Sequence, residues 1–313
     1  MTANEPTRLT MKTTQDLVEV VPLFLSFHPH NSFVMVALPT ATSLSNAFGG
    51  RIDLPESVED ITDCLTAFMS PALRNNAKRV ILYIYDDLEE WPPLLEIASA
   101  MFESAGIAVV DLLHVHHGVG DSKRRPDDRA TIAEPGRIAV QGVADGRVTE
   151  ASREAYVARV ASTVDPRLFY PTSEITEHDA HAYVDWVIDR IGREELTVEQ
   201  VVSLAGALHH PDARDRLLDQ ITTARVPGGD YWWASVARNT PSCPDTQHLF
   251  GPIALGLYVH GTTPLAWAVL DRAPVHTALV DIAHKVIDIG LDPSRFLEAF
   301  NRADESVGEE ADQ

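Results

Sequence analysis

Residues 22–38, with the sequence PLFLSFHPHNSFVMVAL, contain the change of pattern that decides the fold. An apolar helical run breaks at His28-Pro29-His30-Asn31-Ser32 and resumes as a β-branched strand pattern over residues 33–38. Upstream, Thr13 and Asp16 have the spacing of an N-cap for that helix. The stretch therefore predicts a helix, a polar loop and the first strand of an α/β layer. Loops of this kind are a common position for a site.

Further strand signals follow in the first part of the chain. The near-continuous apolar character of residues 79–85 (RVILYIY) predicts a strand buried on both faces, as in a central parallel strand. A helix over 92–104 and a strand over 107–115 complete a β-α-β unit, whose crossover is expected to be right-handed. A short strand at 51–54 is placed to pair with the first strand as a hairpin. Residues 1–120 are thus expected to form an α/β domain with a mixed, mostly parallel sheet and flanking helices.

The rest of the chain changes from sheet to helix signals. Residues 118–136 are rich in Gly, Asp, Lys, Arg and Pro, which predicts a long exposed loop, and residues 121–150 are expected to be the exposed loop and linker between two domains. Residues 151–301 are expected to form an all-α helical domain, because helical periodicities and capping patterns follow one another there. The acidic residues 302–313 are expected to be a frayed tail.

One pattern within the predicted helical domain resembles a tetratricopeptide-type hairpin, in which small residues let two helices pack closely. The small and large residues that carry it are Ala254, Leu257, Gly261, Ala266, Leu270 and Ala273. The unit occurs once, whereas a solenoid needs about three repeats. An ordinary α-hairpin inside a helical domain is the simpler interpretation.

Composition restricts the partners and the compartment. The chain has 25 Lys and Arg against 46 Asp and Glu, a formal charge of -21, which would repel the phosphates of duplex nucleic acid. Cys64 and Cys243 lie far apart and have no zinc spacing, which favours a reducing cytoplasm. The N-terminus has no apolar leader, and no uninterrupted apolar stretch reaches the ~20 residues of a membrane span. The sequence therefore predicts a cytoplasmic protein with no membrane and no duplex nucleic acid partner.

The chain resembles an uncharacterised actinobacterial and actinophage family, the domain of unknown function forty-one ninety-two. The residues that carry the resemblance are Asp16-Leu17, Val21-Pro22, Phe27-His28-Pro29-x-x-Ser32-x-Val34, Arg51-x-Asp53-Leu54-Pro55, Ser152-Arg153-Glu154, Ala213-Arg214-Asp215, and the run from Ala254 through Gly261 to Arg272-Ala273. The N-terminal block is the specific part, and the likeness extends over nearly the whole chain. The resemblance implies an α/β N-terminal half, a helical C-terminal half and a cytoplasmic home, and it implies no activity.

Six polar residues at the loop and at strand ends are the candidate ligand-binding residues: His28, Asn31, Ser32, Arg51, Asp53 and Asp86. Histidine titrates near neutrality, so His28 beside an amide and a hydroxyl is suited to ligand recognition or proton transfer. The alternative is structural. His28 and Ser32 would then satisfy backbone groups at the helix end and strand start, and Arg51 with Asp53 would form a surface ion pair.

A metal site is an alternative interpretation of the next strand ends. His114 and His116 alternate along a strand and so point to the same face, where with Asp86 they would offer two imidazoles and a carboxylate to a divalent metal. Polar residues are also normal where a strand leaves its core. Apart from this alternative, the sequence indicates no metal and no other cofactor.

Motifs for common enzyme classes are absent from the sequence. It has no strand-turn-helix nucleophile between glycines, no G-x-G-x-x-G and no G-x-x-x-x-G-K. The leading expectation is a cytoplasmic non-catalytic scaffold or small-ligand sensor whose helical half binds a protein partner. The alternative is a metal-assisted or acid–base hydrolase of a small polar substrate, with its site at the strand ends and using His28, Asp86, His114 and His116.

Overall fold

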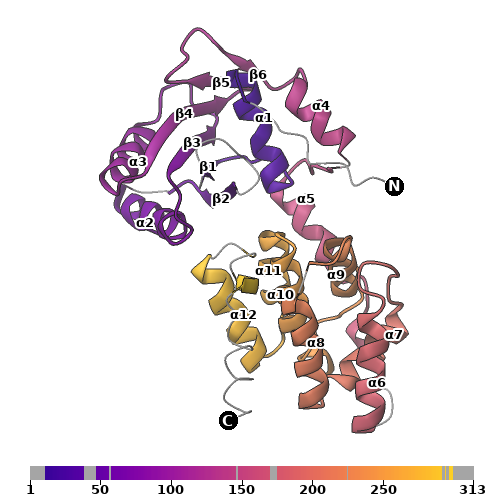
Figure 1. Ribbon diagram of the computed structural model, residues 1–313. Helices are drawn as coiled ribbons and strands as arrows, with labels where there is room; N and C mark the ends of the chain where they lie inside the picture. The colour runs from indigo at the N-terminus through magenta and orange to yellow at the C-terminus, as the bar shows by residue number, and fades with distance from the viewer. Residues whose placement is uncertain are drawn as a thin grey trace. The chain divides into compact units, whose positions relative to one another are not determined.

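The computed structural model describes residues 11–38, 47–55, 58–145, 147–169, 175–223 and 225–290, with short pieces after 290. Its contacts divide the chain into two compact units, Met1–Tyr156 and Val157–Gln313. The first unit is built around a sheet and the second from helices (Figure 1). The region 121–150, for which a loop and linker are expected, falls in the first unit. The expected acidic tail at 302–313 lies outside the described residues.

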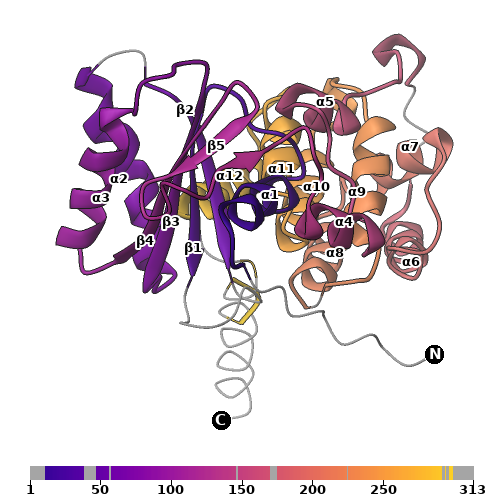
Figure 2. The same ribbon diagram turned by 90° about the horizontal axis from the view of Figure 1, so that it is seen from above.

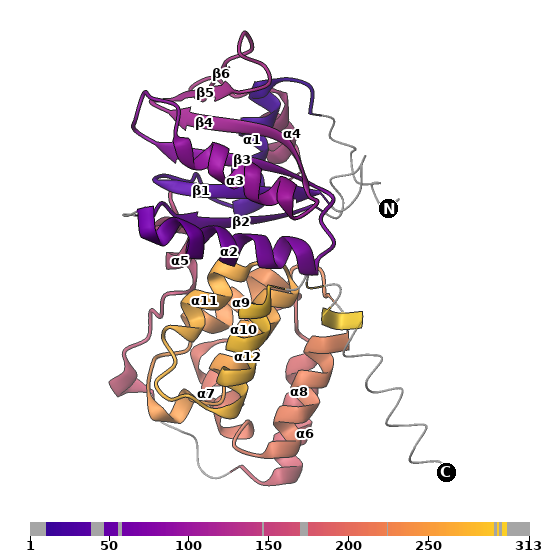
Figure 3. The same ribbon diagram turned by 90° about the vertical axis from the view of Figure 1, so that its left-hand side faces the viewer.

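The first unit contains one mixed sheet of six strands in the order β2-β1-β3-β4-β5-β6, whose succession is visible in Figure 3. The strands are β1 (Ser32–Leu38), β2 (Phe48–Asp53), β3 (Arg79–Asp86), β4 (Ala108–His116), β5 (Val119–Ser122) and β6 (Ala130–Thr131). The helices of the unit are α1 (Thr14–Leu25), α2 (Val58–Arg74), α3 (Pro93–Ser104) and α4 (Arg137–Ala144), and α5 (Arg153–Val157) follows at its end. The predicted β1–β2 hairpin and the β3-α3-β4 unit are both confirmed.

The prediction of a mostly parallel sheet is wrong, because within the described sheet only β3 and β4 pair in parallel. The β1–β2 hairpin reverses the chain, and α2 then returns it to the opposite side of β1. As a result β3 runs antiparallel to β1. The continuous apolar run at 79–85 correctly indicated burial on both faces, since six consecutive residues of β3 are buried. Burial on both faces comes from helices on both sides of the sheet and does not require parallel neighbours.

Helices cover both faces of the sheet (Figure 2). On one face α2 and α3 pack against alternate residues of the central strands, among them Met35, Leu82 and Leu112. On the other face α1 lies across the strands, where the hydroxyl of the fully buried Tyr83 donates a hydrogen bond to the carbonyl oxygen of Leu17 at 3.0 Å. The alternation of side chains along each strand thus divides the core of this unit into two layers.

Local signals in the sequence position α1 and the loop after it. Thr13 and Asp16 form the predicted cap as a reciprocal capping box. The helix ends at Ser26, which has a left-handed conformation with φ 65°. Phe27 then forms a parallel bridge with Glu150, so that the loop 28–31 enters β1 from a fixed point.

The segment 118–136, for which a long exposed loop is expected, contains β5 and β6. His117 and Gly118 make a two-residue turn between β4 and β5, with φ values of 45° and 77°. Positive φ at both central positions is the geometry of the tight hairpin turn, which favours Asn, Asp or Gly. A histidine at the first position is unusual for this turn, which is why the composition of the segment conceals the hairpin.

The second unit is rich in helices. They are α6 (Glu177–Ile188), α7 (Val198–Ala207), α8 (Pro211–Thr223), α9 (Gly229–Arg238), α10 (Phe250–Val259), α11 (Thr263–Leu270) and α12 (Ala278–Ile289), with short 3-10 turns at Ala158–Val160, Pro166–Leu168 and Pro244–Thr246. The α10 helix is buried along its whole length and packs against α8, α9, α11 and α12. It is apolar all round, as a helix in the centre of a core must be. The likeness of α10 and α11 to a tetratricopeptide hairpin stays a prediction.

The apolar α10 helix has only 10 residues. A bilayer span needs about 20. In the part of the chain that the structure describes, no helix combines the length and the apolar character that crossing a membrane requires.

Candidate functional site

The candidate residues gather at one end of the sheet, where several strands begin or end. Ser32 at the start of β1 lies opposite Asp53 on β2 and Tyr85 on β3. Asp86 at the end of β3 lies opposite His116 on β4. The loop 28–31 runs along this end of the sheet into β1. The carboxyl ends of the parallel β3–β4 pair therefore lie beside the imidazole-rich loop.

Three of the predicted residues, Ser32, Arg51 and Asp53, are linked by a hydrogen bond and an ion pair that fix the start of β1. The Nε of Arg51 donates to the Oγ of Ser32 at 2.7 Å, and this hydroxyl donates to the carbonyl oxygen of His30 at 2.6 Å. The Arg51 guanidinium also pairs with Asp53, with 2.5 Å between Nη2 and Oδ1. Asn31 has a left-handed φ of 44°, and its carbonyl accepts from the Leu54 N–H at 3.3 Å. These contacts fit the structural alternative, in which the residues fix the loop.

A chain of paired side chains begins at Asp86. The Nε2 of His114 lies 2.7 Å from Oδ1 of Asp86, and both side chains are at least nine-tenths buried. The Asp86 carboxylate also accepts from the Leu88 N–H at 2.9 Å. His114 stacks on His116 with ring centres 4.5 Å apart and 22° between the planes. Two imidazoles thus lie in contact near the carboxyl ends of β3 and β4.

The second imidazole of this chain is bound to a second carboxylate. The Nε2 of His116 lies 3.0 Å from Asp121, which Arg129 holds with two bonds of 2.6 and 2.8 Å. The hydrogen bond from Arg129 is the main cause that lowers the pKa of Asp121 from 3.8 to about 2. Asp121 is therefore ionised at neutral pH and can only accept. It follows that Nε2 of His116 carries the proton and that in the neutral ring Nδ1 is an acceptor.

The side chains proposed for the metal alternative do not share a point of convergence. His114 turns its Nε2 to Asp86, and His116 turns its Nε2 to Asp121. Among the described residues, the group whose ligand atoms lie within 4.8 Å of one another consists of Glu177, His181 and Asp212 in the helical unit. Two of those three residues are exposed, and exposed acidic groups of this kind are common without a metal.

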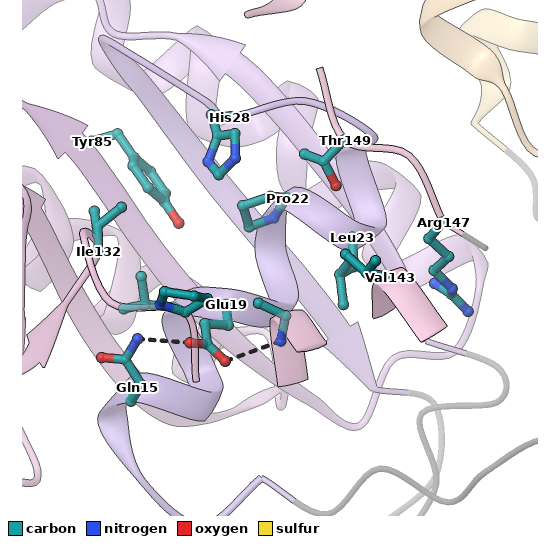
Figure 4. Close-up of a pocket in the computed structure, with 13 residues that line it drawn as sticks. Gln15, Glu19, Pro22, Leu23, His28, Tyr85, Ile132, Val143, Arg147 and Thr149 are labelled. Atoms are coloured by element: carbon teal, nitrogen blue, oxygen red, sulfur yellow. Dashed lines mark hydrogen bonds between the residues drawn. The ribbon is translucent and has the colours of Figure 1, made fainter. Parts of the chain in front are cut away.

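A pocket of about 340 Å³ lies on the α1 side of the sheet (Figure 4). Its apolar wall comes from α1, α4 and the segment before α4: Val18, Pro22, Leu23, Ile132, Pro135, Ala139 and Val143. Its polar groups are Gln15, Glu19, His28, Tyr85, Arg147 and Thr149. Of the six predicted ligand-binding residues, His28 lies in this wall. The volume is at the lower end of the roughly 300 to 1,000 Å³ of small-molecule sites.

Tyr85 is the polar group that stands out in this pocket. Figure 4 shows its ring entering the pocket from β3 with the hydroxyl toward the pocket interior. The residue is 6% exposed, and its hydroxyl has no hydrogen-bond partner among the residues that the structure describes. Burial raises the pKa of this hydroxyl, so it stays protonated and can both donate and accept. Because buried polar groups are almost always bonded, a hydroxyl in a cavity wall that the protein leaves unpaired is available to a group that enters the cavity.

Glu19 fixes one wall of the pocket. Its carboxylate accepts from Gln15 at 2.7 Å and from the backbone N–H groups of Gly136, Ile138 and Ala139, the last two at 3.1 Å. Those amides form the first turn of α4, which has no side-chain cap of its own. A carboxylate at a helix N-terminus satisfies unpaired donors and complements the helix dipole. Glu19 therefore anchors α4 over the sheet.

Sequence reasoning missed Tyr85, Glu19 and Asp121. Tyr85 had a usable signal, because it is the last aromatic residue of a buried strand just before the carboxyl end, where ligands of α/β folds bind. Glu19 had none. It lies within a helix, and its partner Gly136 is 117 positions away in the sequence.

A smaller hollow of about 130 Å³ lies at the ends of β3 and β4. It is lined by Pro29, His30, Tyr85, Asp86, Asp87, Val115, His116, His117, Gly118 and Ile132. Of the four residues named for the hydrolase alternative, His28 lines the larger pocket, Asp86 and His116 line the smaller one, and His114 lines neither.

Comparison with known proteins gives a family. A family model described as Domain of unknown function (DUF4192) matches residues 15–277, which include most of both units, and the chain belongs to this family. No curated protein and no solved structure gave a match.

Proposed function

We propose that the α/β unit of this member of the DUF4192 family binds a small, largely apolar molecule in the pocket between α1 and α4, and acts as a small-ligand sensor. The observation that carries the proposal is the buried hydroxyl of Tyr85, which is unpaired within the described chain and lies beside the apolar side chains of the pocket wall. A ligand with one hydroxyl or carbonyl group would supply the partner that this hydroxyl lacks.

The route of the chain supports a sensing role. Arg147 and Thr149 line the pocket, and the following residue, Glu150, is bonded to the helix-to-strand loop on both sides: its N–H donates to Ser26 at 2.9 Å, and its carbonyl accepts from His28 at 3.0 Å. The chain then continues through α5 to the boundary of the second unit. A ligand that orders this pocket wall would therefore act on the segment that leads into the helical unit.

The acid–base alternative is less favoured by the same geometry. It requires His28, Asp86, His114 and His116 to act on one substrate, and these residues lie in different hollows or in none. Asp86 and His114 are bonded to one another and buried. A protein partner of the helical unit and a cytoplasmic location stay predictions.

Phenethyl alcohol is a suitable probe of the proposal, because it combines an apolar ring with one hydroxyl. We expect it to bind the full-length protein, with saturation transfer in NMR and shifts of the methyl signals of Val18, Leu23 and Ile132. Ala139→Phe, which places a ring in the pocket, should abolish these effects. Val140→Phe is the matched control, since Val140 is the next residue of α4, is 59% exposed and is not part of the pocket wall.

The two variants separate the pocket from the surface around it. Binding that survives Ala139→Phe, or a wild-type protein whose methyl signals do not respond, would remove the proposal. Loss of binding in Val140→Phe as well would mean that the probe contacts the outer face of α4.

A further inference from the structure

The hollow at the ends of β3 and β4 has a composition different from that of the larger pocket. It lies beyond the carboxyl ends of the parallel strand pair, the position where ligands of open α/β sheets bind. At about 130 Å³ it has room for a head group or about four waters, at about 30 Å³ each. It is therefore too small for a whole metabolite and is suited to one polar group of a larger ligand.

The two hollows adjoin one another. Tyr85 and Ile132 line both of them. The loop that enters β1 also passes both, with His28 in the wall of the larger pocket and Pro29 and His30 in the wall of the smaller one. A ligand whose body lies against Tyr85 and Ile132 therefore has its other end within reach of the strand-end hollow.

The strand-end hollow and the larger pocket differ in the charged side chains of their walls. The wall of the strand-end hollow contains the carboxylates of Asp86 and Asp87 and no Lys or Arg. The bonds of Asp86 to Leu88 and His114 both fall on Oδ1, and a carboxylate has about four acceptor positions. Asp87 is 69% exposed and faces His30 across 3.8 Å. The wall of the larger pocket carries one carboxylate, Glu19, and one guanidinium, Arg147, so a cationic group is favoured at the strand ends.

A buried acceptor in the same wall is the second, independent observation. The side chain of His116 is nine-tenths buried, and its Nδ1 has no hydrogen-bond partner within the described chain. Because Asp121 accepts the proton on Nε2, Nδ1 of the neutral ring has a free lone pair. An acceptor without a donor, beside two carboxylates, matches a ligand group that carries several N–H bonds.

We infer that the ligand of this protein is a small amine: its apolar body lies in the pocket between α1 and α4, and its protonated amino group binds at the strand ends, between Asp86, Asp87 and Nδ1 of His116. The inference rests on the proposed function and specifies the class of its ligand. An ammonium group has three donors, enough for both carboxylates and the imidazole nitrogen.

Phenethylamine and phenethyl alcohol are matched probes, since they differ only in the polar group. The two probes are compared at about pH 8, where an alkyl amine stays protonated. We expect the full-length protein to bind the amine at least about tenfold more tightly than the alcohol, as a charge-assisted hydrogen bond provides. The nitrogen NMR signal of the His116 ring should shift with the amine and not with the alcohol.

Asp87→Asn tests the carboxylate, and its exposure means that the fold does not depend on it. The preference for the amine should fall below about threefold, since a hydrogen bond to a neutral acceptor is weaker than one to a charged acceptor. Glu103→Gln is the matched control, because it removes an exposed carboxylate from the end of α3, near the opposite end of β4. It should leave the preference unchanged.

The outcomes distinguish the two proposals. Equal binding of both probes, or a preference that Asp87→Asn leaves intact, would overturn the amine inference while ligand binding in the pocket stands. If neither probe binds, the proposed function itself is lost, and the inference with it. Tighter binding of the alcohol would indicate a neutral ligand.

Discussion

Removing the Tyr85 hydroxyl should stabilise the ligand-free protein. A buried hydroxyl without a partner costs about 1 to 3 kcal/mol of desolvation that no bond returns. Tyr85→Phe keeps the ring and its packing, and it removes this cost together with one oxygen atom of volume. We therefore expect the free energy of opening of the α/β unit to rise by about 1 kcal/mol. Most substitutions of buried residues lower it.

Tyr83 provides a matched control on the same strand and the same face. Its ring stacks near that of Tyr85, with centres 6.4 Å apart, but its hydroxyl donates to Leu17 at 3.0 Å. Tyr83→Phe loses this bond and should lower the free energy of opening by about 1 to 2 kcal/mol. The same Tyr→Phe substitution is thus expected to raise the free energy of opening at one position of the strand and to lower it at the other.

Native-state hydrogen exchange of the β3 amides measures this free energy without requiring the two units to unfold together. The two variants should differ by about 2 kcal/mol or more, which corresponds to roughly thirtyfold in exchange rate. If Tyr85→Phe loses stability as Tyr83→Phe does, the Tyr85 hydroxyl has a partner, and the argument for a missing ligand group fails.

Three further predictions concern other parts of the chain. Glu19→Ala removes the cap of α4 and should speed exchange of the Ile138 amide about tenfold, whereas unchanged exchange would show that Glu19 does not anchor the helix. Burial is the main cause that lowers the pKa of His248 from 6.5 to about 4. As the pH falls through this range, the unfolded chain takes up a proton before the folded chain does, so the stability of the helical unit should fall by about 1 to 2 kcal/mol, after allowance for partial exposure. His248→Gln should remove this pH dependence in thermal unfolding. Gly256→Ala gains about 1 kcal/mol of helix propensity but would push a methyl group into the Trp233 indole, so we expect a net loss of about 1 to 3 kcal/mol in urea unfolding, and a gain would show that the indole can move.

The elements of the fold were largely predictable, and their arrangement was not. Caps such as Thr13 and the apolar run at 79–85 depend on neighbours in the sequence, and these local signals placed α1 and β3 correctly. Strand direction depends on how a crossover returns the chain, which no local pattern records. The prediction of a mostly parallel sheet was therefore wrong. The hairpin at His117 and Gly118 was missed because it uses a histidine where the usual turn residues are Asn, Asp or Gly.

The candidate site shows why residue type alone does not identify a ligand group. Arg51 and His116 were both plausible ligand-binding residues from the sequence, and both lie at the same end of the sheet. Arg51 is bonded to Ser32 and Asp53, so its polar groups are used within the protein. His116 is bonded at one nitrogen and has none of the described residues as a partner at the other. The difference lies in hydrogen bonds between distant strands, and a polar group becomes evidence for a ligand only when the fold has left it unsatisfied.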